Sequence, residues 1–226
     1  MNNQNATKQV KSGRSKRGRP ALSEAQRQEM RDKIALATQR LFKEEGYRNI
    51  SMRRIAEEVG CAPMTLYQYY DSKLDILHTL WNEVFDELFG GLAELELEGR
   101  EAQEQLRHLA SAYVSYWVDN PDHYRLVYMT EGVSQSDVSV FIDDPDLMAR
   151  YQVFAEVFGI VCANAFPRAV MAKKLDTLMC FLQGIIHNRV TISGYPWPDL
   201  DDMVSLAIHG VLLSLIHISE PTRHVD

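Results

Sequence analysis

The 226-residue sequence has few of the features that mark secreted, membrane-bound or metal-binding proteins. Its three cysteines, Cys61, Cys162 and Cys180, lie far apart, so neither a disulfide framework nor a zinc site is predicted. No apolar segment follows the basic N-terminal stretch, which argues against a signal peptide. The longest run without Asp, Glu, Lys or Arg, residues 203–219, is short for a membrane span. We therefore expect a cytoplasmic protein that binds neither a membrane nor a metal.

Sequence motifs of catalysis are missing as well. The chain contains no nucleophile elbow, no glycine-rich phosphate loop and no histidine pair with metal-ligand spacing. Its seven histidines are scattered, as ordinary surface or interface residues are. We therefore expect a protein that is not an enzyme and needs no cofactor.

Positive charge is concentrated at the N-terminus. Residues 1–22 contain six Lys and Arg residues and no acidic residue. The net charge of the whole chain is -7; without these six residues, 18 Lys and Arg remain against 31 Asp and Glu, which leaves -13 on the rest. A basic arm on an acidic body indicates that one end meets nucleic-acid phosphate, although such tails are also common as solubilising or disordered ends.

Apolar residues recur at helical spacing almost throughout the chain, and no convincing strand-like alternation appears. We therefore predict an all-α fold with about nine helices. A long helix beginning at Ser72 is expected to end at Gly90 and Gly91, because glycine weakens a helix interior. Later helices are expected around residues 106–117, after Pro121, around 147–158, around 175–185 and from about 199 onward.

The N-terminal pattern predicts a helix-turn-helix. A first helix is expected from Ser23 to Gly46, where the glycine suits a left-handed end position. Ser51 can cap a short second helix that Gly60 ends, and Pro63 suits the first position of a third. Two short helices joined by such a turn form an arrangement whose second helix can lie in a DNA major groove.

Residues 63–70 would then present an uncharged polar edge. Leu66 and Tyr70 lie one turn apart on the inner face, and the outer residues carry no charge, whereas a solvated helix face normally carries Lys and Glu. Gln68 can read an adenine edge, Thr65 a base or a thymine methyl group, and tyrosine hydroxyls can bind phosphate oxygens. The expected outer residues are Met64, Thr65, Tyr67, Gln68 and Tyr69.

Groups suited to phosphate surround this segment. Lys73 stands at the first position of a helix, where a cation opposes the positive end of the helix dipole and a bound phosphate would reverse that effect. Ser51, Arg53 and Arg54 begin the preceding helix and can offer a hydroxyl, a backbone NH or charge. Each alone is more often a routine cap or a solvated arginine, but their placement around one short helix predicts contacts to the DNA backbone.

Residues 34–77, IALATQRLFKEEGYRNISMRRIAEEVGCAPMTLYQYYDSKLDIL, resemble the DNA-binding domain of the tetracycline-repressor (TetR) family. This close resemblance covers about a fifth of the chain, and the order of the later helices resembles the family's ligand-binding and dimerisation domain more loosely. The matching positions are Phe42, Gly46, Ser51, Ile55, Ala56, Gly60, Leu66, Tyr67, Tyr70 and Lys73.

The resemblance implies roles for individual residues. It implies that Thr65 and Gln68 face bases. Met64 departs from the small or polar residue that is more usual there, so the base preference at this position stays open. The resemblance also implies phosphate contacts from Ser51, Tyr67, Tyr69 and Lys73.

A second DNA-binding element is predicted upstream. The sequence KRGRP at residues 16–20 resembles the core of an AT-hook, in which a flat Arg-Gly-Arg segment lies along a narrow minor groove. Arginine is attracted to the negative potential of A/T-rich DNA, and glycine permits close approach. We therefore expect Arg17 and Arg19 to follow the minor groove, the alternative being an inert tail.

The larger C-terminal region is rich in aromatic residues. Most of them are expected to fill the core, as is usual for aromatic stripes at helical spacing. The resemblance nevertheless implies a cavity for a small, largely apolar effector, although His187 could equally reach the subunit interface. The candidate ligand residues are Tyr113, Trp117, Tyr124, Tyr128, Phe154, Phe158 and His187.

The resemblance also implies a homodimer in which the last two helices of each subunit form a four-helix bundle. Two-fold symmetry would make the DNA target palindromic. The predicted function is a repressor whose affinity for its operator falls when an effector stabilises another spacing of the two recognition helices. The alternatives are a constitutive DNA-binding or architectural protein, which a body filled by side chains would favour, and a redox-responsive regulator acting through Cys61.

The C-terminal end fits this picture poorly. Leu213 to Arg223, LSLIHISEPTR, resembles the translation of a transposase library adapter, the alternative being a last helix that continues and frays. We therefore expect four parts: a basic arm at 1–22, a DNA-binding domain at 23–71, a ligand-binding and dimerisation domain at 72–212, and a non-native tail at 213–226.

Overall fold

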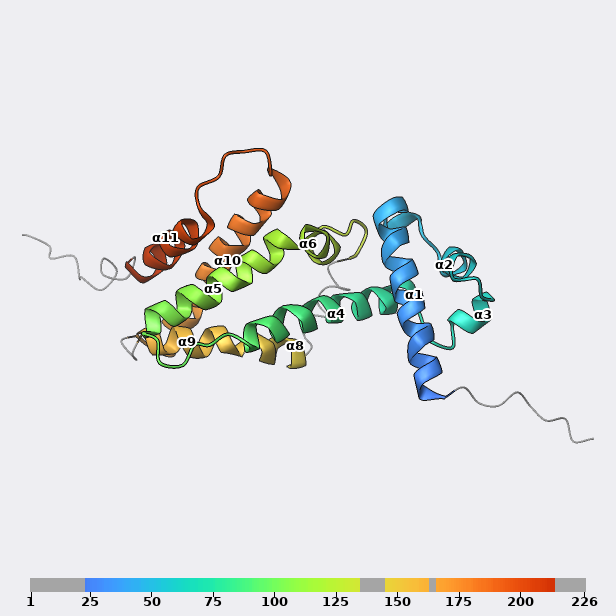
Figure 1. Cartoon of the computed structure of the whole chain (residues 1–226), viewed down its shortest axis with the longest axis horizontal. Helices are drawn as coiled ribbons and strands as arrows, with labels where there is room; N and C mark the ends of the chain where they lie inside the picture. Colours follow the sequence, from blue (N-terminus) through green and yellow to red (C-terminus); the bar gives the residue numbers. More distant parts are fainter. Residues whose placement is uncertain (1–22, 135–144, 163–165, 214–226) are drawn as a thin grey trace, which may run out of the picture.

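The computed structural model describes residues 23–134, 145–162 and 166–213 (Figure 1). Within these ranges it contains helices and no strand, which confirms the predicted all-α fold. No helix in these ranges is both long enough and apolar enough to cross a bilayer. The elements are α1 (Glu24–Glu45), the 3-10 helix η1 (Tyr47–Asn49), α2 (Met52–Val59), α3 (Pro63–Leu66), α4 (Lys73–Ala93), α5 (Ala102–Asp119), α6 (Pro121–Tyr128), α8 (Pro145–Arg150), α9 (Gln152–Cys162), α10 (Arg168–Thr191) and α11 (Leu200–Leu213).

Local signals place the N-terminal helices as predicted. Ser23 caps α1 in a reciprocal pair with Gln26, and Gly46 follows the helix with a positive φ of 77°. Ser51 caps α2 by accepting a bond from the backbone NH of Arg54, and Gly60 ends α2 in the left-handed conformation. These caps set the ends of the helices independently of their packing.

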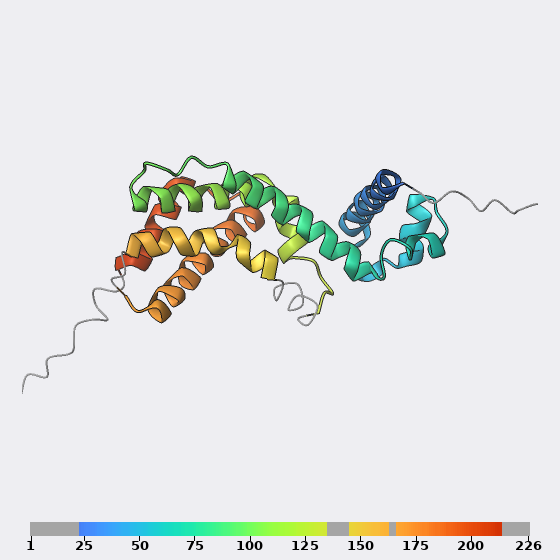
Figure 2. The same cartoon turned by 90° about the horizontal axis from the view of Figure 1, so that it is seen from below.

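The long helix α4 joins the two halves of the molecule. Its first residues pack against α1, and its later part packs against α5 and α6 (Figure 2). Ser72 caps it by accepting a bond from the NH of Asp75, but the carboxylate of Asp75 accepts from Asp71 rather than completing a capping box with Ser72. A rotation of α4 would therefore move both halves.

The predicted end of α4 at Gly90 and Gly91 is wrong, because the helix continues to Ala93. Each glycine costs a helix about 1 kcal/mol relative to alanine. Leu92, one residue further, is buried at 5% exposure, and burying a leucine side chain contributes about 1.5–3 kcal/mol. Packing of the last turn offsets the glycine cost.

The remaining helices form the larger body. The helix predicted around 147–158 is interrupted at Tyr151, which separates α8 from α9. Helices α5, α9, α10 and α11 pack against one another, while α6 packs against α4 and α5. The indole of Trp81 on α4 donates to the carbonyl of Leu126 on α6 at 2.9 Å, and this buried bond fixes α6 against α4.

Candidate nucleic-acid interface

The segment 63–70 is anchored by its inner side chains. Leu66 is fully buried and Tyr70 is 2% exposed, as predicted. Both belong to the core that α1 and α2 build with residues such as Ile34 and Ile55. These two inward-pointing residues fix the segment against the rest of the domain.

The outer edge of this segment is uncharged and accessible. Met64 is 76% exposed and Tyr67 is 49% exposed, and Gln68 is also exposed, so the prediction of their exposure is confirmed. Thr65 is half-buried beside them. The geometry leaves amide, hydroxyl and methyl groups free to meet the edges of bases.

The prediction that Tyr69 lies on this outer edge is wrong, because Tyr69 is only 8% exposed and belongs to the core. The α-helical residues end at Leu66, and the following turn is partly tighter: the NH of Gln68 bonds to Thr65 and the NH of Tyr69 to Leu66. In such three-residue turns, side chains three apart eclipse one another. Tyr69 therefore falls in line with the buried Leu66.

Lys73 begins α4 and is tied to the residues before α2. Its ammonium donates to the carbonyls of Tyr47 and, at 2.8 Å, of Ile50, and lies 4.0 Å from the centroid of the Tyr47 ring. Partial burial lowers the pKa of Lys73. These acceptors offset the unfavourable helix-dipole position that had suggested a phosphate ligand. An ammonium has three donors, so one remains for a phosphate.

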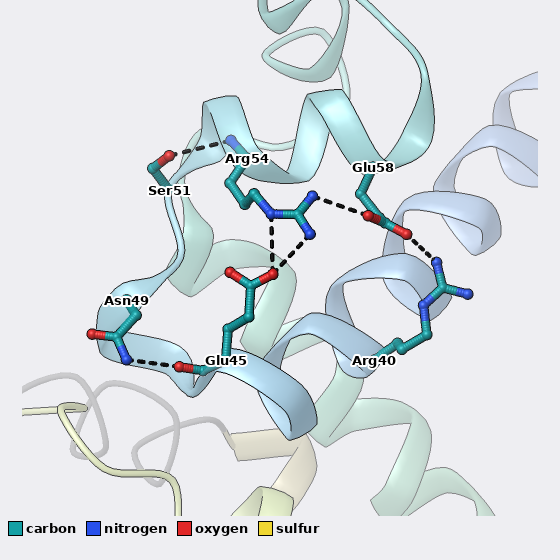
Figure 3. A network of polar contacts seen from close by, with 6 residues as sticks. All are labelled: Arg40, Glu45, Asn49, Ser51, Arg54 and Glu58. Atoms are coloured by element: carbon teal, nitrogen blue, oxygen red, sulfur yellow. Dashed lines mark hydrogen bonds and ion pairs between the residues drawn. The ribbon is translucent and has the colours of Figure 1, made fainter.

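Arg54 joins α2 to α1 (Figure 3). Its guanidinium donates to Glu45 at 3.0 and 2.7 Å and to Glu58 at 2.9 Å, and Glu58 also accepts from Arg40. The bond from Arg54, followed by that from Arg40, lowers the pKa of Glu58. Three donor bonds within the domain hold this guanidinium, so its first role is to orient α2.

Arg53, the neighbouring residue, faces solvent. Its side chain is 82% exposed, and its ion pair with Glu57, one turn further along α2, is 3.4 Å long. Such an exposed pair contributes little to stability and is easily exchanged for another anion. Ser51 is exposed at the start of the same helix, beside Arg53. The first turn of α2 thus offers an exposed hydroxyl and an exposed cation. Arg17 and Arg19, predicted for the minor groove, lie outside the described residues.

The residues predicted to bind an effector are brought together in the body, where they pack on one another. Trp117 lies 5.3 Å from Tyr128 and 6.0 Å from Tyr124 between ring centroids, and Tyr113 lies 5.4 Å from Phe154. We call this group the aromatic core; with the buried Phe158, all of these except Tyr128 are at most 2% exposed. Aromatic edge-to-face packing of this kind is a stable filling of a helical core.

Polar groups nevertheless line one side of the aromatic core. The Tyr124 hydroxyl lies 3.2 Å from Nδ1 of His187 and accepts from Gln183 at 3.3 Å. Burial raises the pKa of Tyr113 well above the usual value, and burial of the hydroxyl end of Tyr128, whose side chain is otherwise 42% exposed, does the same, so both hydroxyls stay neutral. Tyr151, which the sequence analysis missed, interacts with both hydroxyls and packs 4.8 Å from Phe89 between ring centroids. Aromatic residues at helical spacing usually fill the core, so no sequence signal separates Tyr151 from them.

Comparison with known proteins identifies the helix-turn-helix region of this arrangement. Residues 34–80 match the family model of bacterial regulatory proteins, tetR family. The HTH-type transcriptional activator FasR of Mycolicibacterium smegmatis (strain ATCC 700084 / mc(2)155) is 24% identical over 154 residues, which cover 66% of this chain and 66% of that protein. An HTH-type transcriptional regulator of Staphylococcus aureus (strain USA300) is 44% identical over 50 residues, which cover 22% of this chain and 27% of the relative. The chain thus matches about two thirds of the first relative's length and about a quarter of the second's.

Solved structures resemble the fold over most of the chain. The crystal structure of a putative TetR-family transcriptional regulator from Syntrophomonas wolfei str. Goettingen has a TM-score of 0.64 and 16% identity, covering 88% of this chain and 100% of that one. At this identity the likeness concerns the fold alone. It extends over both halves of the molecule, beyond the helix-turn-helix.

Proposed function

The chain is a helix-turn-helix protein of the TetR family of transcriptional regulators, and we propose that it is a homodimeric repressor that a small, largely apolar effector releases from a palindromic operator. The observation that carries this proposal is the exposed, uncharged edge of Met64, Tyr67 and Gln68 on a segment anchored by Leu66 and Tyr70. A rigid anchor and an exposed polar edge are what major-groove reading requires.

We assign the DNA contacts by chemistry and exposure. Thr65 and Gln68 read bases, and Met64 offers an apolar surface that suits a thymine methyl group. Phosphate contacts come from the exposed groups around the segment, chiefly Ser51, Arg53 and Tyr67, with the third ammonium proton of Lys73. Tyr69 contributes through the packing that holds the segment. Arg17 and Arg19 add a minor-groove contact.

The dimer is supported by apolar side chains exposed on the last helices. Phe181 on α10 is 49% exposed and Leu206 on α11 is 73% exposed, although both helices otherwise pack into the body. Burying such side chains against a second copy would remove them from water. A two-fold dimer of this kind presents two recognition segments to one duplex, which requires a palindromic site. A bacterial regulator of this design works in the cytoplasm, where DNA is.

Two observations favour alternatives to an effector-released repressor. The relative from Mycolicibacterium smegmatis is named an activator, which favours the opposite sign of regulation. The dense packing of the aromatic core favours constitutive DNA binding, without an effector in that core. Cys61, half-buried in the turn before α3, would make DNA binding sensitive to peroxide in the redox alternative.

The test is the selection of DNA bound by the purified full-length chain from a random pool. The proposal expects two inverted half-sites, with centres spaced by about one helical turn of DNA or a multiple of it, and A/T-rich flanks. Recovery of a single asymmetric motif, or of no motif at all, would contradict it. Unchanged affinity for the selected site after peroxide treatment would dismiss the redox alternative.

A further inference from the structure

A cleft of about 790 Å³ separates the helix-turn-helix domain from the body. One wall is the C-terminal half of α1 with η1, and the other is α6 with the residues that follow it, as the facing ends of α1 and α6 in Figure 1 indicate. Small-molecule sites commonly enclose about 300–1,000 Å³ and often lie between domains. We call this space the interdomain cleft; the aromatic core lines no part of it.

Apolar groups line both walls of the interdomain cleft. Phe42 and Leu126 are each 8% exposed and form fixed parts of the walls. Leu36 on α1 is 68% exposed and Met129 after α6 is 42% exposed, so each presents apolar surface to the cleft that no neighbour covers fully. A ligand with an apolar portion would cover surface that otherwise contacts water.

Cations outnumber acidic groups around the same space. Lys43 and Arg125 share one carboxylate, Asp122, at 2.6 and 3.2 Å. Lys43 and Asp122 are 69% and 55% exposed, so this ion pair between the two halves is hydrated and exchangeable. The other acidic group in the lining is Glu131. An anion entering the cleft therefore meets an excess of positive charge.

Arg48 supplies the best-placed cation. It belongs to η1, and its side chain lies against Gly132 of the body, where a Cβ would collide with Cγ, Nε and Cδ of the arginine. Among the described residues no carboxylate lies within ion-pair distance of its guanidinium. The guanidinium is thus positioned by packing, and its fork of donors suits a carboxylate or sulfonate.

We propose that the interdomain cleft binds a small amphipathic anion, whose acidic group faces Arg48 and Lys43 and whose apolar part covers Leu36 and Met129. Such a ligand would contact both halves of the molecule at once. Because η1 leads directly into α2, a ligand that prefers one spacing of the walls shifts the orientation of the helix-turn-helix. Binding of the anion stands on the cleft alone, while its effect on DNA rests on the function proposed above.

The first experiment measures binding without DNA. The probe is 8-anilinonaphthalene-1-sulfonate, an amphipathic anion whose fluorescence rises in apolar surroundings, titrated into the folded full-length chain. We expect the Lys43→Gln/Arg48→Gln double variant to raise its dissociation constant about fivefold, the size of effect of an exposed charge pair. Lys173→Gln, an exposed charge change on α10, should leave the constant unchanged. Thermal melting of each variant verifies that the chain is folded.

Two further measurements locate the probe. N-phenyl-1-naphthylamine, which lacks the sulfonate, should bind the wild type and the double variant equally. Tyr124→Phe, which removes the hydroxyl beside His187 in the aromatic core, should leave sulfonate binding unchanged. The proposal is overturned if the double variant binds the sulfonate as tightly as the wild type, or if Tyr124→Phe weakens binding more than the double variant does.

The second experiment connects the cleft to DNA. Once an operator has been selected, saturating sulfonate probe should change the operator affinity of the wild type by about fivefold or more, and that of the double variant by less than twofold. If no operator is found, the proposed function fails while the probe titration still stands. If an operator is found and the probe binds in the cleft without changing the affinity of the protein for that operator, the cleft is a binding site without regulatory effect. The proposed coupling is then refuted.

Discussion

The helix-turn-helix domain and the body use aromatic and polar side chains in opposite ways. In the first, Tyr67 and Gln68 lie on the surface while the buried Leu66 and Tyr70 anchor the segment that carries them. In the second, Trp117 and Tyr113 are buried, and the Tyr113 hydroxyl interacts with the side chains of Tyr128 and Tyr151. A surface for a macromolecule exists before its partner arrives, whereas a site inside a packed core has to be opened by its ligand, which costs packing. This difference explains why the predicted DNA-binding residues are more evident in the structure than the predicted effector residues.

Trp117→Ala would test the packing of the body most severely. The indole is fully buried among five aromatic rings, so its removal leaves a cavity and should reduce the free energy of unfolding by about 3–5 kcal/mol. Tyr67→Ala, an aromatic truncation in the other region at 49% exposure, should change it by less than about 0.5 kcal/mol. Urea unfolding of both full-length variants measures the two effects. Equal losses of unfolding free energy in the two variants would contradict the contrast between a packed body and an exposed DNA-facing edge.

Gln68→Ala would test base reading by the surface residues. We expect discrimination at one base pair in each half-site to fall by about 1–3 kcal/mol, because the amide can no longer pair with a base edge. Binding to operators that carry single substitutions measures this change, with Gln152→Ala on α9 as the control. An equal loss of affinity for specific and random DNA would show that Gln68 does not read sequence.

Lys73→Ala would test a residue that is proposed to contact DNA phosphate and that also bonds to backbone carbonyls within the domain. Loss of a phosphate contact should weaken binding about uniformly across sequences and reduce the salt slope by about 1. Loss of the bonds to Tyr47 and Ile50 should also lower the melting temperature. Salt titrations and thermal unfolding separate the two effects, with Lys173→Ala as the control; a lower melting temperature with an unchanged salt slope would assign Lys73 to the scaffold alone.

The adjacent arginines Arg53 and Arg54 provide a matched pair. Arg53→Ala should weaken DNA binding with little change in melting temperature, because its side chain is exposed. Arg54→Ala should lower the melting temperature more, because Glu45 and Glu58 lose their shared partner. Thermal unfolding and DNA titration of both variants give the comparison; a reversed order in either measurement would contradict the division of roles.

The smallest expected effect concerns acid stability. The pKa of Glu58 is lowered from its usual value of 4.5, so its ionised form stabilises the fold above that pH. This contribution is lost as the pH falls below 4.5 through the lowered pKa. Glu58→Gln should therefore flatten the dependence of melting temperature on pH below 4.5, whereas Glu104→Gln, in an exposed pair on α5, should not. If the dependence of melting temperature on pH is the same for Glu58→Gln and the wild type, the Glu58 carboxylate does not stabilise the fold.

The sequence predicted those features whose causes are local. The caps at Ser23 and Ser51, the proline at the start of α3 and the alternation of inward and outward residues in 63–70 all act within one or two helical turns. The burial of Tyr69 was not predictable in this way, because it follows from a turn tighter than an α-helix. The expected domain boundaries and the four individual phosphate contacts remain predictions.

By itself, therefore, the sequence determined the N-terminal helices, their caps and the polar edge that suits DNA, since these depend on neighbours along the chain. Only the tertiary structure decided that Arg54 orients α2 and that Lys73 binds carbonyls far back along the chain. It also decided that Lys43 forms an ion pair with Asp122, 79 residues later, across a cleft that no sequence motif predicts. Side chains from distant segments acquire partners only when the packing of helices brings them together, and that packing sums many contacts that no local pattern encodes.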